Sequence, residues 1–202
     1  MTALVPAALL LCAGLLQAQA PPSADALTAH LKDFSLLHVD FTQTRTLAAL
    51  SRPLKSSGSM VLSKEQGVLW QIRKPLTLGF VITPKGLAEV GADGKVRLKT
   101  AKDAPVVAQM GRILQSLLQG KWSALEDFFT VRGEGNPGQW KILLTPKPQT
   151  AAFLKGIQIS GGRFIQRVHV DEAGGDSMEL VFERPRTADP LTAAEARLLA
   201  GA

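Results

Sequence analysis

The stretch from Ser56 to Pro75 constrains the fold most, because its apolar residues recur with the period of a β-strand. Two short runs within it place an apolar side chain at every second position. These positions are Met60 and Leu62 in the first run, and Val68, Trp70 and Ile72 in the second. Glu65-Gln66-Gly67 separates the runs and predicts a turn. A period of two is expected of strands with one buried face, so the stretch predicts a β-hairpin with one apolar and one polar face.

Several further segments have the same character, an apolar strand face that ends at a glycine or proline turn. Asp93-Gly94, between the runs 87–90 and 95–99, is the strongest short-range hairpin signal in the chain. The other expected strands are Val39–Thr46, Phe80–Ile82, Phe128–Arg132, Trp140–Thr145, Gly156–Ser160, Arg163–Asp171 and Ser177–Glu183. The sequence therefore predicts a mainly β protein with helices, built on a single curved antiparallel sheet of about ten to eleven strands.

Two stretches have helical periodicity instead. A short helix is expected from Ser23, a residue suited to capping a helix N-terminus, with Leu27 and Leu31 on one face. The second helix, from Ala104 to Gln119, carries a wide apolar stripe. Gly111 in its middle weakens it by roughly 1 kcal/mol relative to alanine. We therefore predict that this helix is a movable cover and not a fixed element of the core.

The two ends of the chain predict export and a single domain. Residues 3–16 are apolar and uncharged, and small residues follow them, as in a secretory signal peptide. We expect a signal peptide over residues 1–18, with cleavage near Ala18 to Ala20. One domain is then expected over residues 19–186, followed by a weakly ordered or helical tail over residues 187–202.

The residues that carry most enzyme chemistry are few and scattered. Cys12 is the single cysteine and lies in the leader, so the exported chain is expected to have no disulfide. His30, His38 and His169 are far apart, without partners at metal-ligand spacing, and each is expected at the surface or rim. We therefore expect no catalytic residue, no metal and no cofactor. The formal net charge is +6, but Lys and Arg are scattered singly, so no nucleic-acid partner is expected.

Short motifs between Ala24 and Phe182 occur in an order and spacing that together are fairly specific. They are Phe41-Thr42-Gln43, Ser57-Gly58, Trp70 with Pro75 five residues later, Ile82-Thr83, Gly86 and Leu143-Leu144-Thr145-Pro146-Lys147. In these motifs the chain resembles the LolA family of periplasmic outer-membrane lipoprotein carriers, or a divergent branch of it. The resemblance implies an unclosed half-barrel sheet with an apolar concave face, which an α-helical lid covers and acyl chains occupy.

The resemblance and the strand alternation together give a candidate lipid-binding cavity on the concave face. Its residues are Val39, Phe41, Met60, Leu62, Val68, Trp70, Ile72, Phe80 and Ile82. The candidate lid residues, in the helix from Ala104 to Gln119, are Val106, Met110, Ile113, Leu114, Leu117 and Leu118. The family's lid-locking arginine aligns with Lys64, which keeps the charge without the forked hydrogen bonding of a guanidinium. Lys64 is therefore the candidate lid lock. The family's final strand is expected to be missing after Phe182.

The resemblance implies a monomeric periplasmic carrier and not an enzyme. Such a carrier takes acylated lipoproteins from an inner-membrane lipoprotein-releasing ABC transporter to an outer-membrane lipoprotein receptor. Other interpretations stay open: a LolA-like carrier of another acylated lipid, a periplasmic lipid or envelope-stress sensor domain of the same fold, or an ordinary sandwich in which the apolar residues fill a core. An enzyme is the weakest interpretation.

Overall fold

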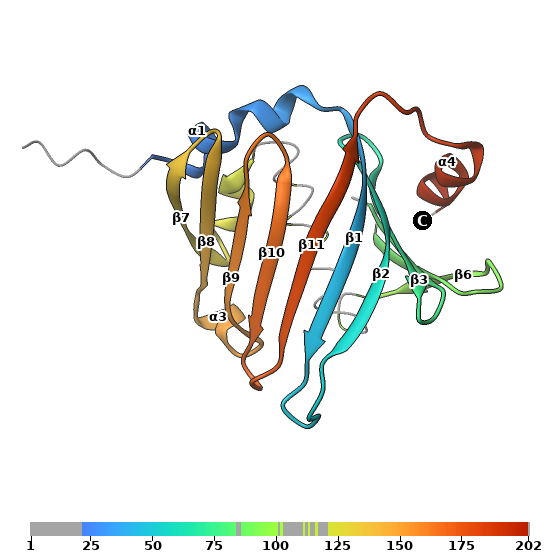
Figure 1. The fold of residues 1–202 in the computed structure, drawn as a ribbon, viewed down its shortest axis with the longest axis horizontal. Coiled ribbons are helices and arrows are strands. Elements are labelled where there is room, and N and C mark those ends of the chain that lie inside the picture. Colours follow the sequence, from blue (N-terminus) through green and yellow to red (C-terminus); the bar gives the residue numbers. More distant parts are fainter. Residues whose placement is uncertain are drawn as a thin grey trace, which may run out of the picture.

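The computed structural model describes residues 22–83, 86–100, 102, 111, 113, 116 and 121–201. Their main feature is one antiparallel sheet of eleven strands, which is curved (Figure 1). The strands are β1 (Leu36–Thr46), β2 (Leu54–Ser63), β3 (Gly67–Lys74), β4 (Leu78–Thr83), β5 (Gly86–Val90), β6 (Val96–Lys99), β7 (Phe129–Asn136), β8 (Gln139–Pro146), β9 (Leu154–Gly161), β10 (Ile165–Glu172) and β11 (Ser177–Arg186). The predicted mainly β fold is confirmed.

The first and last strands of the chain meet in the middle of the sheet. The strand order is β6-β5-β4-β3-β2-β1-β11-β10-β9-β8-β7, so β1 pairs with both β2 and β11. The edge strands β6 and β7 follow each other along the chain and lie at opposite ends of this order. The sheet is therefore an unclosed half-barrel, as predicted, and residues 100–128 connect its two edges.

Gly58 on β2 permits a close approach to β3. The pairing register of these strands shifts between Ser57 and Gly58, which marks a bulge. A β-carbon on Gly58 would lie 1.8 Å from the carbonyl oxygen of Gln71, so only glycine fits here. Because bulges bend a strand and increase its twist, this position contributes to the curvature of the sheet.

Short helices border the sheet. They are α1 (Ala24–Thr28), the 3₁₀ helices η1 (Ala29–Asp33) and η2 (Trp122–Leu125), α3 (Pro148–Ala151) and α4 (Ala193–Ala200). The expected N-terminal helix begins as predicted, since the Ser23 side chain accepts a hydrogen bond from the backbone N–H of Ala26. In Figure 1, α1 and η1 run along the upper end of the sheet, and α3 lies at its lower end. Residues 1–21, with the predicted signal peptide, lie outside the described residues.

One continuous apolar core covers the concave face. It contains buried residues from every strand except β6, and from α1, η1 and η2. Two buried indoles attach peripheral elements to it. Nε1 of Trp122 donates to Oγ1 of Thr28 at 2.9 Å, and Nε1 of Trp140 donates to the carbonyl oxygen of Gly162 at 2.8 Å. Since buried indole N–H groups need such partners, these bonds fix η2 against α1 and the β9–β10 turn against β8.

A second, smaller apolar core lies on the outer face, under α4. Its buried members are Val61, Leu69, Val81, Ala88 and Leu199. Leu199 belongs to α4 and is only 4 % exposed. The tail, expected to be weakly ordered or helical, thus contains a helix that packs on the sheet. The prediction of a polar outer face for the 56–75 hairpin is wrong, because α4 covers this face and excludes water from it.

Polar contacts fix α4 to β1. The Thr192 hydroxyl accepts from the backbone N–H of Glu195, and the Glu195 carboxylate accepts from Thr192 in return, forming a capping box. Oε2 of Glu195 also lies 3.5 Å from Nε2 of His38. Burial alone would raise the pKa of Glu195, but hydrogen bonds from Thr192 and His38 outweigh burial and lower this pKa. His38 is only 7 % exposed, so its predicted surface or rim position is wrong.

Candidate functional site

The nine residues predicted to form a cavity lie together on the concave side of four neighbouring strands. Val39 and Phe41 come from β1, Met60 and Leu62 from β2, Val68, Trp70 and Ile72 from β3, and Phe80 and Ile82 from β4. All are buried except Ile72, which is half-buried against the others. Trp70 pairs with Met60 on one side and Phe80 on the other, and it meets Phe41 edge-on at 5.9 Å between ring centroids. The strand registers therefore bring the set into one apolar surface.

This surface continues into a hollow of about 300 Å³, which we call the mouth. The mouth lies at the end of the sheet where the β1–β2 and β3–β4 turns are found. Its lining consists of Gln43, Arg45, Leu54, Lys55, Ser56, Ile72, Pro75, Leu76 and Leu78. Of the predicted cavity residues, Ile72 lines it. The mouth is open to solvent and mostly apolar, so it is a place where the concave core can be reached from outside.

Two polar side chains of β1 contribute to the mouth. NH2 of Arg45 lies 3.0 Å from Oε1 of Glu172, yet Nε of Arg45 and Oε1 of Gln43 are buried without a hydrogen-bond partner among the described residues. Leaving a buried polar atom unpaired costs about 1–3 kcal/mol. A secondary amide group would supply both the missing acceptor for Nε and the missing donor for Oε1, whereas an ester would supply the acceptor alone. Sequence reasoning omitted both residues, although alternation along β1 places them on the same face as Val39 and Phe41.

The predicted lid helix is described at Gly111, Ile113 and Ser116, which are all helical. Ile113 is fully buried in the concave core. A β-carbon on Gly111 would lie 2.6 Å from Cδ1 of Ile82, so the helix backbone lies directly over β4. Of the candidate lid residues, those outside the described part of the chain are Val106, Met110, Leu114, Leu117 and Leu118.

Lys64, the candidate lid lock, lies in the turn between β2 and β3. Its backbone N–H donates to the carbonyl oxygen of Ser35 at 3.0 Å. This turn is at the opposite end of the strands from the mouth, because β2 and β3 run between the two. A lock at Lys64 would thus act far from the mouth, and the role of this residue stays a prediction.

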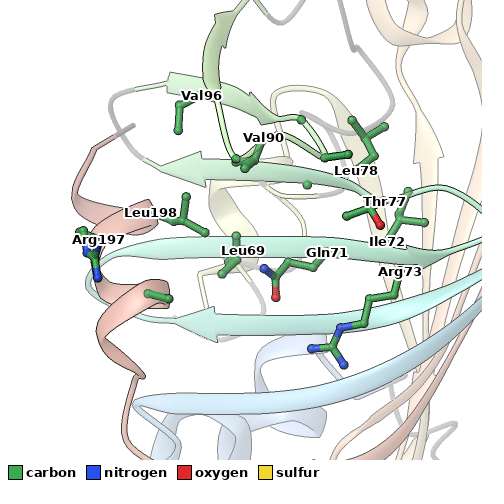
Figure 2. A pocket seen from close by; sticks show the side chains of 15 residues that line it. Leu69, Gln71, Ile72, Arg73, Thr77, Leu78, Val90, Val96, Arg197 and Leu198 are labelled. Carbon is green, nitrogen blue, oxygen red and sulfur yellow. The ribbon is translucent and has the colours of Figure 1, made fainter.

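A larger hollow, about 590 Å³, lies on the outer face between α4 and the β5–β6 turn (Figure 2). Leu69 and Gln71 of β3 lie along its floor, and Leu198 of α4 extends over it. Sequence reasoning missed this groove because it depends on the docking of α4. Ile72 and Leu78 line both the groove and the mouth, so the two hollows lie close together beside the β3–β4 turn.

Two of the three histidines make contacts that hold the fold together. Nε2 of His30 is 2.7 Å from the carbonyl oxygen of Gly162, and Nε2 of His169 is 3.2 Å from Asp171. Within the described residues, no group of three or more His, Cys, Asp or Glu side chains is placed to hold a metal ion. The described helices are also too short or too polar to cross a lipid bilayer. The chemistry that this arrangement supports is the sequestration of apolar groups.

Residues 18–172 match the family model described as outer membrane lipoprotein carrier protein LolA-like. The chain belongs to this family. The resemblance seen in the sequence motifs is therefore confirmed. Comparison with curated proteins gives no match. The LolA-like family is one of carrier and binding proteins and is not an enzyme family.

Solved structures are similar to this chain at low sequence identity. A DUF1329 family protein from Desulfovibrio piger is 9 % identical, with a TM-score of 0.50 over 84 % of this chain and 94 % of that one. A LolA superfamily protein from Nitrosomonas europaea is 7 % identical, with a TM-score of 0.49 over 84 % of this chain and 96 % of that one. At such identities the likeness is one of architecture alone.

Proposed function

We propose that this LolA-like protein is a periplasmic carrier of acylated lipoproteins. It holds the acyl chains against the concave face while it moves from an inner-membrane lipoprotein-releasing ABC transporter to an outer-membrane lipoprotein receptor. The observation that carries the proposal is the single apolar core on the concave face of an unclosed sheet, continuous with an open mouth. A signal peptide at residues 1–18 brings the chain to the periplasm in this scheme, and the carrier acts as a monomer.

The energetics of acyl chains explain why such a carrier needs a wide apolar face. Three acyl chains contain roughly 45 methylenes, and at about 0.8 kcal/mol each their full exposure to water costs over 30 kcal/mol. A mouth of about 300 Å³ is at the lower end of the range of ligand pockets. Loading therefore requires that the concave core opens further. In this proposal the 104–119 helix moves away from the sheet, which separates Gly111 from Ile82.

Mass spectrometry of the lipid that co-purifies with the exported protein tests the proposal. We expect an acylated lipoprotein, bound in the native complex and lost on denaturation. A second arm uses Ile72→Glu, which places a charge at the mouth, and Val90→Glu as its control. Both positions are half-buried, but Val90 lines the outer groove. Ile72→Glu should lose the cargo while Val90→Glu keeps it.

Other outcomes point to the alternatives or against a carrier. Co-purification of an acylated lipid without a protein moiety would make the chain a LolA-like carrier of that lipid. Cargo that binds but is never released to acceptor vesicles or a receptor would favour a lipid or envelope-stress sensor. Equal cargo content in Ile72→Glu, Val90→Glu and the unmodified protein would contradict binding at the concave face.

A further inference from the structure

Exposed apolar side chains are concentrated at one end of the sheet. Seven large apolar side chains are exposed among the described residues, and six of them lie at the end that carries the mouth. These six are Leu50 and Leu54 in or beside the β1–β2 turn, Leu76 in the β3–β4 turn, Val96 at the start of β6, Phe128 before β7 and Phe153 after α3. Antiparallel pairing places all of these turns at the lower end of the sheet in Figure 1. Such clustering of exposed apolar groups marks an interaction surface.

The charges at this end are unevenly distributed. The β1–β2 and β3–β4 turns, taken together with the strand residues that flank them (46–55 and 73–78), carry four basic side chains and no acidic one. The four are Arg52, Lys55, Arg73 and Lys74. They are exposed and form no ion pair with a described residue. Other elements at this end carry acidic side chains, namely Glu126 and Asp127 before β7, Asp93 in the β5–β6 turn, and Glu172 and Asp176 at the β10–β11 turn. Asp176 accepts a hydrogen bond from the backbone N–H of Ala48, so it lies beside the β1–β2 turn. The basic character therefore belongs to the β1–β2 and β3–β4 turns alone.

These two turns also form the border of the mouth. Leu54 and Lys55 from the first turn, and Pro75 and Leu76 from the second, line it directly. Leu76 is 76 % exposed, so most of its side chain faces solvent even though it touches the hollow. Of the four cations, Lys55 lines the mouth and Arg73 lines the neighbouring outer groove. Leucines interleaved with cations at this end of the sheet have the chemistry of a lipid interface, which differs from that of a packed protein core.

We propose that the β1–β2 and β3–β4 turns dock on the surface of an anionic lipid bilayer. Leu50, Leu54 and Leu76 enter the headgroup region, while Arg52, Lys55, Arg73 and Lys74 contact lipid phosphates, their aliphatic stems lying along the leucines. Each basic residue near an anionic membrane strengthens binding by about fivefold. Docking in this way directs the mouth toward the bilayer. Membrane binding depends on the turns alone, whereas its use for exchanging acyl chains rests on the proposed function.

Co-sedimentation of the exported protein with lipid vesicles tests the docking. We expect binding to vesicles that contain phosphatidylglycerol, weaker binding in high salt, and little binding to pure phosphatidylcholine. Arg52→Gln with Arg73→Gln should weaken binding to anionic vesicles by roughly 25-fold, given about fivefold per charge. The matched control, Lys121→Gln with Lys141→Gln, removes the same charge from other parts of the surface and should lower binding only slightly.

The apolar contribution has its own control. Leu50→Ser with Leu76→Ser should weaken vesicle binding, whereas Leu98→Ser should not, although Leu98 on the edge strand β6 is 79 % exposed and as accessible as Leu76. All variants change exposed side chains, and circular dichroism establishes that they fold. Absence of binding to anionic vesicles, or an equal loss in variants and controls, overturns the proposal. If the turn variants still bind vesicles, the proposal is also overturned. This holds even if the turns are then found to bind an acidic protein instead of a membrane.

The same preparations separate this proposal from the proposed function. Turn variants that lose vesicle binding but keep co-purified acyl cargo support docking and leave the carrier function in place. Vesicle binding that depends on the turns, in a protein that never contains acyl cargo, supports docking and contradicts the carrier function.

Discussion

Gly111 packs so closely on Ile82 that no other residue fits its place in the helix without a shift. A β-carbon on Gly111 would lie 2.6 Å from Cδ1 and 2.7 Å from Cγ2 of Ile82. The sequence alone indicates that this glycine weakens a helix that would gain from alanine. The structure gives it a different role, because the missing side chain lets the helix approach β4.

Gly111→Ala is expected to destabilise the protein. Overpacking of a filled core costs about 1–3 kcal/mol, which exceeds the roughly 1 kcal/mol gain in helix propensity. Thermal unfolding followed by circular dichroism measures the change. In a double-mutant cycle, Ile82→Ala should reduce the cost of Gly111→Ala, since it vacates the space that the new methyl group enters. A melting temperature raised by Gly111→Ala alone would contradict the close packing.

A disulfide between positions 111 and 82 is expected to block cargo uptake. The β-carbon position of Gly111 lies 3.0 Å from Cβ of Ile82, which is shorter than the roughly 3.5–4.5 Å found in disulfides, so the bond between Gly111→Cys and Ile82→Cys should form after the helix and the strand move slightly apart. Uptake of a fluorescent acylated peptide should stop in the oxidised protein and resume after reduction. The reduced form of the same protein is the control. If oxidised and reduced protein take up the peptide at the same rate, the 104–119 helix is not a lid.

Arg45 is expected to contribute to cargo retention through its buried Nε atom. Arg45→Met removes this donor and the ion pair with Glu172, and should weaken retention of acylated peptide roughly tenfold, the magnitude of one hydrogen bond to a charged group. Arg167 is the matched control, because it forms a similar cross-strand ion pair with Glu179 outside the mouth. Competition binding compares Arg45→Met with Arg167→Met, and an equal effect would contradict a role for Arg45 in the mouth.

The attachment of α4 is expected to weaken in acid. The pKa of Glu195 is lower in the folded protein than its ordinary 4.5, so the folded state binds this proton less well than the unfolded state. The stabilisation is present above pH 4.5 and is lost as the pH falls through the folded pKa. Hydrogen exchange of residues 193–200 at pH 7 and below pH 4 measures it.

Glu195→Gln gives the control for this pH dependence. The glutamine keeps a side chain that can accept from Thr192 but does not titrate. In this variant the exchange of α4 should be less dependent on pH between 7 and 4 than in the unmodified protein. If both proteins respond equally to acid, another group controls the attachment of the helix.

The concave face could be predicted from sequence, whereas the outer face could not. Alternation identified the inward set from Val39 to Ile82 because strand periodicity and burial agree on that side. The alternation predicted that Val61 and Leu69 lie on the solvent-exposed face, although both are buried under α4. The uninterrupted runs Met60-Val61-Leu62 and Val68-Leu69-Trp70 carried the missing signal, since strands covered on both faces are apolar at successive positions.

The start of α4, the helix that packs on the outer face, could be predicted from the sequence. Thr192 and Glu195 have the spacing of a capping box, which predicts a helix start between them. Its docking site could not be inferred, because the contact with His38 joins residues that are far apart along the chain. The same limit applies to the mouth, where Arg45 meets Glu172 only after β1 and the β10–β11 turn have come together.

The pairing of β1 with β11 has a consequence for the order in which the chain can fold during its synthesis. Asp40 pairs with Glu183, so the central seam joins the first strand of the sheet along the chain to the last one. Strands β2 to β6 can pair with their sequence neighbours as they emerge, but one edge of β1 stays without a partner until residue 186 is available. A nascent chain of this topology therefore cannot complete the central seam of its sheet until β11 has been synthesised.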